Sequence, residues 1–160
     1  MNRVLVAIED ETFGQAIVDF VGQLKWPSGA KFKLIHVIEP QPIVDAPPSY
    51  WQEALEQSIA RGQKLLDGLA AKLRAQISGA DVVQEVVEGF AKETILEMAE
   101  DWKVDLIIMG SHGRKGFSRF LLGSVSSAVS ENAGCSTLIV RLPQAKDKTR
   151  SQAEQKSLTK

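Results

Sequence analysis

The sequence predicts an α/β fold in which a doubly wound parallel sheet carries helices on both of its faces. Short apolar runs rich in β-branched residues, such as residues 4–8, recur along the chain, as is typical of strands buried on both sides. Between these runs, apolar residues recur at the spacing of an amphipathic helix. Strands and helices that alternate in this way form a parallel sheet through right-handed crossovers.

The first unit of the fold is a strand over residues 4–8 followed by a helix. Asp10 and Glu11 open that helix, Asp10 as its N-cap and Glu11 as a charge that favours its dipole. The residues expected on the buried face of the helix are Phe13, Ala16, Ile17, Phe20, Val21 and Leu24.

A second strand is predicted over residues 31–38, and a long helix follows it after a loop. Residues 39–49 are rich in proline, which is incompatible with regular structure there. Apolar residues then recur at helical spacing over residues 51–73. Gly79 is expected to end this helix as a left-handed cap.

The second half of the chain continues the alternation of strands and helices. A third strand is predicted over residues 82–88 and a fourth over residues 104–109. The helix between them has an inner face made of Ile95, Met98, Ala99 and Trp102. A fourth helix is expected from Ser124, a good N-cap, to about residue 133, and a fifth strand over residues 137–142.

Length and charge limit the class of protein. The chain has 160 residues, of which 44% are hydrophobic, so we expect one domain over residues 1–142 and a polar, disordered tail over residues 143–160. A net charge of −1 and a pI near 6.1 argue against nucleic acid or an anionic membrane as the main partner. Because we find no apolar leader, no run of membrane-spanning length and a single cysteine, we expect a cytoplasmic protein.

A spaced glycine motif lies between the predicted fourth strand and the predicted fourth helix. The segment Gly110-Ser111-His112-Gly113 is followed by nine residues and then by Gly123-Ser124. Glycines at a strand-to-helix junction let backbone N–H groups approach an anion, and the start of the helix adds unpaired donors. The motif therefore predicts a phosphate cradle and a nucleotide ligand. It lacks the lysine of a P-loop, and the first strand is not followed by the G-x-G-x-x-G pattern of dinucleotide-binding folds.

The spacing G-x2-G-x9-G-[ST], together with the first strand, resembles the universal stress protein family in its ATP-binding branch. The resemblance covers residues 2–142. It implies a Rossmann-like sheet of the adenine nucleotide alpha hydrolase type, with five strands in the order 3-2-1-4-5. It also implies a protein that binds ATP, ADP or AMP, dimerises and acts as a nucleotide-dependent regulatory module in the stress response. Because residues 138–142 are nearly all apolar and form a sheet edge in this strand order, we expect the dimer to pair through the fifth strand.

The candidate nucleotide contacts lie at the ends of three strands and in the cradle. Val37 would hold the edge of the adenine through its backbone, as the resemblance implies. Arg114, like Lys115 and Arg119, either neutralises phosphate charge or is part of a solvated basic loop. Ser126 is either a secondary contact or a solvated serine. The full set of candidates is Ala7, Ile8, Glu9, Val37, Met109, Gly110, Gly113, Arg114, Gly123, Ser124, Val125 and Ser126.

Glu9 stands where the family that the sequence resembles carries an aspartate that accepts hydrogen bonds from the ribose hydroxyls. Glutamate keeps the acceptor but adds a methylene, so its carboxylate must fold back or move the sugar. The cluster Glu9-Asp10-Glu11 would also repel a triphosphate unless the phosphates point away or a divalent cation, such as Mg²⁺, lies between them.

Two functions from different classes remain open. The first is a regulatory module that binds ATP with little turnover, and the second is a slow ATPase or phosphotransferase that uses the same pocket. Phosphoryl transfer needs a positioned base, and outside the acidic cluster the motif puts no carboxylate or histidine beside the γ-phosphate, so binding is favoured. We interpret His36 as a packed histidine, His112 as a loop histidine and Cys135 as a small hydrophobe.

Overall fold

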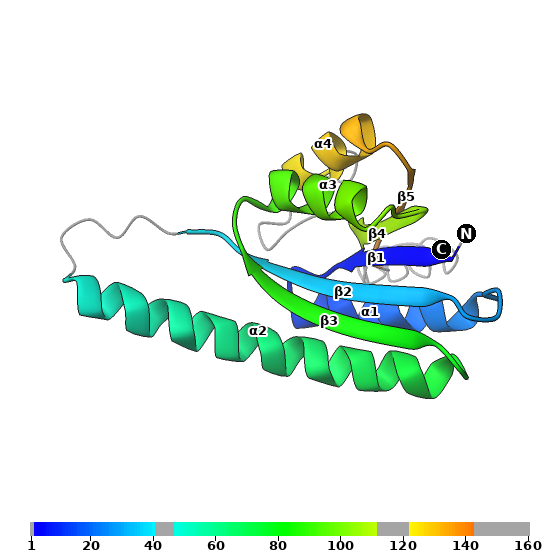
Figure 1. Cartoon of the computed structure of the whole chain (residues 1–160), viewed down its shortest axis with the longest axis horizontal. Helices are drawn as coiled ribbons and strands as arrows, with labels where there is room; N and C mark the ends of the chain where they lie inside the picture. The colour runs from blue at the N-terminus through cyan, green and yellow to red at the C-terminus, as the bar shows by residue number, and fades with distance from the viewer. Residues whose placement is uncertain (1, 41–46, 112–121, 143–160) are drawn as a thin grey trace, which may run out of the picture.

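The computed structural model describes residues 2–40, 47–111 and 122–142 and contains every strand and helix that the sequence predicts (Figure 1). The predicted tail, residues 143–160, lies outside the described residues. The elements in chain order are β1 (Arg3–Ala7), α1 (Glu11–Gln23), β2 (Lys31–Ile38), α2 (Pro48–Gln76), β3 (Asp81–Glu88), α3 (Ala91–Asp101), β4 (Leu106–Gly110), α4 (Ser124–Asn132) and β5 (Ser136–Val140).

The strands form one five-stranded sheet in the order β3-β2-β1-β4-β5, with every neighbouring pair parallel. The order that the family resemblance implies is therefore confirmed. Ala7 of β1 pairs with Ile35 of β2 on one side and with Met109 of β4 on the other. The carboxyl ends of these three strands thus meet at one edge of the sheet. The direction of winding reverses between β1 and β4, which is where open α/β sheets bind ligands.

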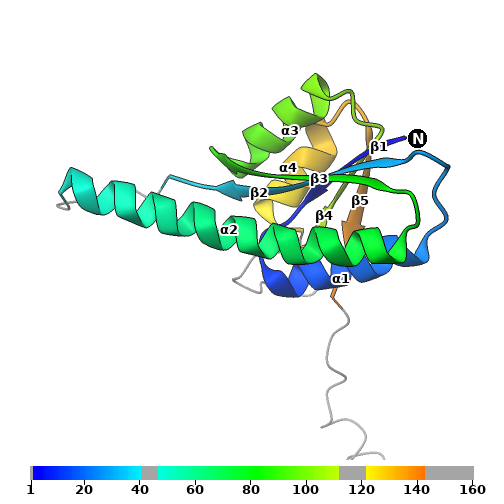
Figure 2. The same ribbon diagram turned by 60° about the horizontal axis from the view of Figure 1, so that its bottom comes forward.

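Helices cover both faces of the sheet, as predicted: α1 and α2 pack on one face, and α3 and α4 pack on the other (Figure 2). The core has two halves that the sheet separates. Ile17, Phe32 and Leu66 are fully buried on the α1–α2 side. Ile107 is fully buried on the α3–α4 side, where it packs with Ile95 and Val129. Burial of this apolar surface is the main force that holds the helices to the sheet.

Three predicted helix ends differ from the structure. The prediction that residues 39–49 have no regular structure is wrong at its end, because α2 already begins at Pro48, where a missing N–H at the first helical position costs nothing. Asp10 caps α1 as expected, because its Oδ1 accepts from the Phe13 N–H at 2.9 Å. Ser124, however, is the first residue of α4 and not its N-cap; Gly123 takes the extended N-cap conformation instead, with φ −61° and ψ 157°. Gly79 has the left-handed φ of +75° that was expected, yet it lies in the turn after α2, whose C-cap is Ile77.

The fourth strand begins later than predicted. Val104, expected to open it, still belongs to the turn that closes α3, because its N–H donates to the Ala99 carbonyl at 2.9 Å. Lys103, in the same turn, has a positive φ of 52°. A turn of this tightness leaves no room for strand pairing before residue 105.

Helix α2 is much longer than the strands on which it packs. Its 29 residues span roughly 43 Å at the usual rise per residue, whereas the 8 residues of β3 span roughly 27 Å. The first turns of α2 therefore extend past the carboxyl edge of the sheet (Figure 1). The middle turns of α2 lie beside the end of β2, where a Cβ at Gly62 would be 2.7 Å from Cδ2 of His36.

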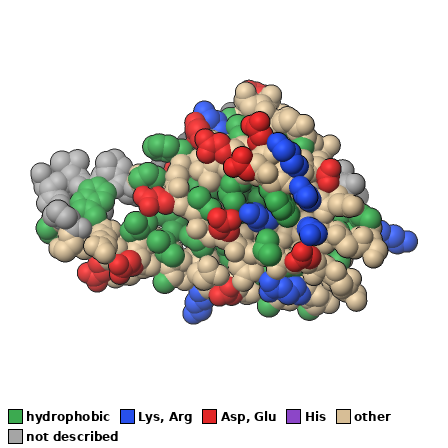
Figure 3. Space-filling model, in the orientation of Figure 1, with side chains coloured by type: hydrophobic (Ala, Val, Ile, Leu, Met, Phe, Trp, Pro, Cys, Tyr) green, Lys and Arg blue, Asp and Glu red, His purple; other side chains and the backbone are tan. Residues whose placement is uncertain are grey.

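The face over β2 and β3 carries charges of both signs. Lys31 lies 3.8 Å from Asp81, and Lys33 lies 3.2 Å from Glu85, so each pair joins the two strands. Figure 3 shows basic and acidic side chains interspersed on this face. Exposed pairs of this kind add little stability. Among the helices that the structure describes, none combines the length and apolar character that a membrane span needs.

Asp105 ties the start of β1 to the start of β4. Its Oδ2 accepts hydrogen bonds from the Arg3 N–H at 3.0 Å and from the Asn2 N–H at 2.7 Å. These two bonds lower the pKa of the Asp105 carboxyl below its ordinary value of 3.8, and the bond from Arg3 has the larger effect. A carboxyl whose pKa is lower in the folded state stabilises the fold above its unfolded pKa, and this contribution is lost as the pH falls through the folded pKa.

Asp105→Asn is therefore expected to lower the midpoint of urea unfolding at pH 7 and to lower it much less near pH 3. The measurement is urea unfolding of both proteins at the two pH values, followed by circular dichroism. A difference between wild type and variant that is as large near pH 3 as at pH 7 would contradict the assignment.

Candidate functional site

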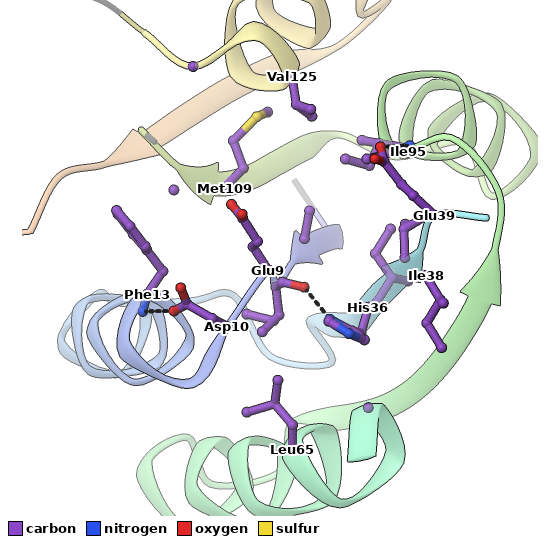
Figure 4. Close-up of a pocket in the computed structure, with 18 of the residues that line it drawn as sticks. Glu9, Asp10, Phe13, His36, Ile38, Glu39, Leu65, Ile95, Met109 and Val125 are labelled. Carbon is purple, nitrogen blue, oxygen red and sulfur yellow. Dashed lines mark hydrogen bonds between the residues drawn. The ribbon is translucent and has the colours of Figure 1, made fainter. Parts of the chain in front are cut away.

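A cavity of about 990 Å³ lies at the carboxyl edge of the sheet, where the winding reverses. The ends of β1, β2 and β4 form its base. Leu65 of α2 lies on one side of it, and Ile95 of α3 and Val125 of α4 lie on the other (Figure 4). The cavity therefore draws on both halves of the chain.

Every predicted nucleotide contact that falls within the described residues lines this cavity. Gly113 and Arg114 lie outside the described residues, as do His112, Lys115 and Arg119. The residues that the structure brings together are Ala7, Ile8, Glu9, Val37, Met109, Gly110, Gly123, Ser124, Val125 and Ser126.

Glu9 and Val37 occupy the two strand ends at the centre of the cavity. Glu9 is exposed and points from the end of β1 toward Met109 (Figure 4). Val37 lies two residues after Ile35, whose carbonyl accepts from the Ile8 N–H at 2.8 Å. Because backbone groups two residues apart on a strand face the same neighbour, the N–H and C=O of Val37 point toward the side of β1, where β1 has already ended.

Gly110 ends β4 in contact with an aromatic ring. A Cβ at this position would lie 2.7 Å from Cδ1, 3.1 Å from Cγ and 3.2 Å from Cε1 of Phe13. These distances leave no space for a methyl group beside the ring. The glycine that the motif analysis assigned to close approach of a phosphate is thus also required by packing against α1.

The two ends of the cradle segment meet at Ser111. Gly123 N–H donates to the Ser111 carbonyl at 2.8 Å, and Ser111 N–H donates to the Val140 carbonyl at 3.0 Å. Ser126, 3% exposed, has its Oγ within 3.2 Å of the same Ser111 carbonyl and 3.1 Å of the Gly123 carbonyl. Ser126 is therefore not a solvated serine; it joins the first turn of α4 to the end of β4.

The charged side chains of the cavity are mostly acidic. Glu9, Asp10, Glu11 and Glu39 line it, and Arg61 of α2 is the one lysine or arginine among the described lining residues. Glu39 Oε1 accepts from the Ala91 N–H at the start of α3, at 3.2 Å. Within the described part of the chain, no three His, Cys, Asp or Glu side chains lie close enough together to hold a metal ion.

Residues 1–141 match the sequence profile of the universal stress protein family. The chain belongs to this family. Universal stress protein MJ0531 of Methanocaldococcus jannaschii is 36% identical over 115 residues, which cover 71% of this chain and 66% of that protein. Universal stress protein A homolog 2 of Coxiella burnetii is 34% identical over 144 residues, which cover 88% of this chain and 95% of that protein.

Solved structures share the fold of this universal stress protein. Protein MJ0577 of Methanocaldococcus jannaschii superposes with a TM-score of 0.79 at 24% identity, over 90% of this chain and 98% of that one. A universal stress protein in complex with cAMP has a TM-score of 0.62 at 25% identity, over 87% and 96% of the two chains. An Arabidopsis thaliana protein of the family, with AMP bound, has a TM-score of 0.63 at 18% identity, over 92% and 97%.

The structure adds residues to the cavity that the sequence analysis missed. Those from α2 are Ser58, Arg61, Gly62 and Leu65, and those from α3 are Ala91 and Ile95. Only Gly62 gave a signal, because a glycine inside a long helix weakens it and indicates a close approach to another element. His36, interpreted as a packed histidine, is half-buried and also lines the cavity, with Nδ1 2.9 Å from the Ile8 carbonyl oxygen.

Proposed function

We propose that this universal stress protein binds an adenine nucleotide (ATP, ADP or AMP) in the cavity at the carboxyl edge of its sheet. The observation that carries the proposal is the convergence, in one cavity, of the strand ends and cradle residues that the sequence analysis selected. AMP and cAMP bound to two proteins of the same fold support an adenine nucleotide as the ligand. In this proposal the protein acts in the cytoplasm as a dimeric regulatory module of the stress response.

The chemistry of the cavity gives the nucleotide a direction. The phosphates belong at Gly110, Gly123 and Ser124, where the first N–H groups of α4 have no capping side chain and favour an anion. The base belongs at the end of β2, where the Val37 backbone offers both a donor and an acceptor. The ribose then lies between them, beside the carboxylate of Glu9.

This direction keeps the phosphates at the α4 side of the cavity, while Asp10 and Glu11 lie at the start of α1. A triphosphate would still lie near negative charge, so Mg²⁺ is expected to enter with the phosphates. Mg²⁺ is usually held by phosphate oxygens, water and one or two carboxylates, and it does not need a cage of protein ligands. Glu9, Asp10 or Glu11 would supply the carboxylate.

Binding is favoured over turnover because several polar groups of the cavity already have structural partners. Asp10 caps α1, Glu39 accepts from the start of α3, and His36 contacts the Ile8 carbonyl. A general base must lie within reach of the nucleophile, and groups that these bonds hold at the ends of β1, β2 and α3 are not free to turn toward phosphates at α4. The slow ATPase or phosphotransferase alternative would have to draw its base from the remaining groups.

Calorimetric titration with ATP, AMP and adenosine tests the proposal through Glu9. Wild type is expected to bind all three ligands. Glu9→Ala should weaken binding by about 1–3 kcal/mol, because the ribose hydroxyls lose their acceptor, whereas Glu9→Asp should bind at least as well as wild type. Glu97→Ala is the matched control, because it removes the same charge from an exposed position on α3 that does not line the cavity.

Three outcomes would count against the role of Glu9 or against the proposal as a whole. Tighter ATP binding by Glu9→Ala, with adenosine unaffected, would mean that the carboxylate mainly repels the phosphates. Equal affinities of wild type, Glu9→Asp and Glu9→Ala would remove residue 9 from the site. Failure of the wild type to bind any adenine nucleotide would overturn the proposal itself, and mass spectrometry of small molecules that co-purify with the protein gives an independent check.

A further inference from the structure

The proposed function gives His36 no role, although its ring lies in the cavity (Figure 4). Its Nδ1 is 2.9 Å from the carbonyl oxygen of Ile8, and the dashed line in Figure 4 marks this contact. A carbonyl oxygen can only accept a hydrogen bond. The contact therefore requires the proton on Nδ1, which fixes the tautomer of the neutral ring.

This hydrogen bond lies where the β1–β2 ladder stops. The last paired residues are Ala7 and Ile35, and the Ile8 N–H adds one bond to the Ile35 carbonyl. In a parallel ladder the next bond would run from the Val37 N–H to the Ile8 carbonyl. That bond is absent from the described backbone, and the imidazole of His36 occupies the carbonyl in its place.

We propose that His36 is a positioning residue that keeps the backbone of Val37 open to the ligand. By holding the Ile8 carbonyl, His36 stops the ladder one bond short and leaves the Val37 N–H facing the cavity. The same bond fixes the peptide group that precedes Glu9. The inference rests on the proposed function, in which Val37 binds the edge of the base.

Helix α2 holds the ring in this position. A Cβ at Gly62 would lie 2.7 Å from Cδ2 of His36 and 3.2 Å from Cγ2 of Val86. Only glycine lets the helix approach so closely, which explains why a residue that weakens helices stands there. Gly68, six residues further along α2, has no atom within 4 Å of its Cβ position and therefore offers a matched control.

Hydrogen exchange of the ligand-free protein, measured by NMR, tests the inference without any nucleotide. In the wild type the Val37 amide is expected to exchange rapidly. In His36→Phe the ring remains but the donor is lost, so Val37 can bond to the released carbonyl, and its exchange should slow by about tenfold or more. His36→Asn should keep rapid exchange, because its amide nitrogen takes the place of Nδ1. Slow exchange of Val37 in the wild type, or unchanged exchange in folded His36→Phe, would overturn the inference.

Affinity for AMP supplies the second readout. His36→Phe should weaken binding about fivefold to tenfold, the worth of one hydrogen bond, and His36→Asn should recover part of the loss. Gly62→Ala, whose methyl group displaces the ring, should slow Val37 exchange and weaken AMP, whereas Gly68→Ala should change neither. Should His36→Phe not fold, the two glycine variants decide: equal behaviour of both would contradict the inference.

The two readouts separate the inference from the function on which it rests. If the wild type binds no adenine nucleotide, but the Val37 amide exchanges rapidly in the wild type and slowly in His36→Phe, the proposed function is wrong. The inference that His36 ends the hydrogen-bond ladder between β1 and β2 then still holds. If the wild type binds AMP and folded His36→Phe binds it equally well, His36 does not position the site.

Discussion

Gly110→Ala is expected to lower the free energy of unfolding by about 1–3 kcal/mol and to weaken nucleotide binding at the same time. The added Cβ would lie 2.7 Å from Phe13 Cδ1, well inside van der Waals contact. Phe13 is 9% exposed in the core, and Asp10 holds its backbone N–H, so relief of the contact requires either a new ring rotamer against packed neighbours or a shift of the start of α1. Such a shift would carry Glu9 and Asp10 with it, because they directly precede the helix.

A double-mutant cycle measures this contact. Phe13→Leu shortens the side chain that faces Gly110, so the double variant Gly110→Ala with Phe13→Leu should be more stable than the sum of the two single effects predicts. Gly134→Ala is the matched control, because no atom lies within 4 Å of its Cβ position and its effect should be small. The measurements are urea unfolding and titration with AMP. Additive effects of the two single changes would mean that the ring does not limit residue 110.

The fold could be predicted from the sequence because local pattern and overall topology agree. The continuous apolar run over residues 4–8 can be satisfied only by burial on both faces, and β1 indeed lies in the middle of the sheet. The N-cap at Asp10 follows from local hydrogen bonding alone. The order of the strands does not follow from periodicity; it came from the family resemblance, which rests on the spacing of the glycine motif.

The site could be predicted only in part, because much of it depends on contacts between elements far apart in the sequence. The glycine motif locates Ser124 by its position in the chain, and the family resemblance points to Glu9 and Val37 at the ends of the first and second strands. The residues of α2 enter the cavity because the middle turns of that helix pack beside the end of β2, and apart from Gly62 nothing local in the sequence marks this contact. The bond from His36 to the Ile8 carbonyl depends on where a ladder stops, and strand propensity does not encode this point.

Ile139→Lys is expected to convert a dimer into a monomer. In the described sheet β5 is an edge strand, with β4 on one side only. The Ser136 N–H and the Val140 carbonyl both bond toward β4, so by alternation Thr137 and Ile139 point their backbone groups away from it. An edge with open backbone groups and apolar side chains favours pairing with a second chain, and a lysine opposes it.

Light scattering of the purified protein measures this directly. Wild type should show about twice the chain mass of 17.5 kDa, and Ile139→Lys should show the mass of one chain. Val83→Lys is the matched control: Val83 is 45% exposed on β3, the opposite edge of the sheet, and the same change there should leave the dimer intact. Thermal unfolding checks that each variant is folded.

Thr137→Pro separates loss of the dimer from loss of the fold. Proline removes the Thr137 N–H, which faces away from β4, and therefore spares the ladder that holds β5 in its own sheet. If strand five forms the dimer, this variant should be a folded monomer, as Ile139→Lys should be. A wild type that stays monomeric at its highest soluble concentration, or a Thr137→Pro variant that remains dimeric, would mean that the edge at β5 is not the interface. The effect of Ile139→Lys would then come from the half-buried packing of its side chain against α3 and α4.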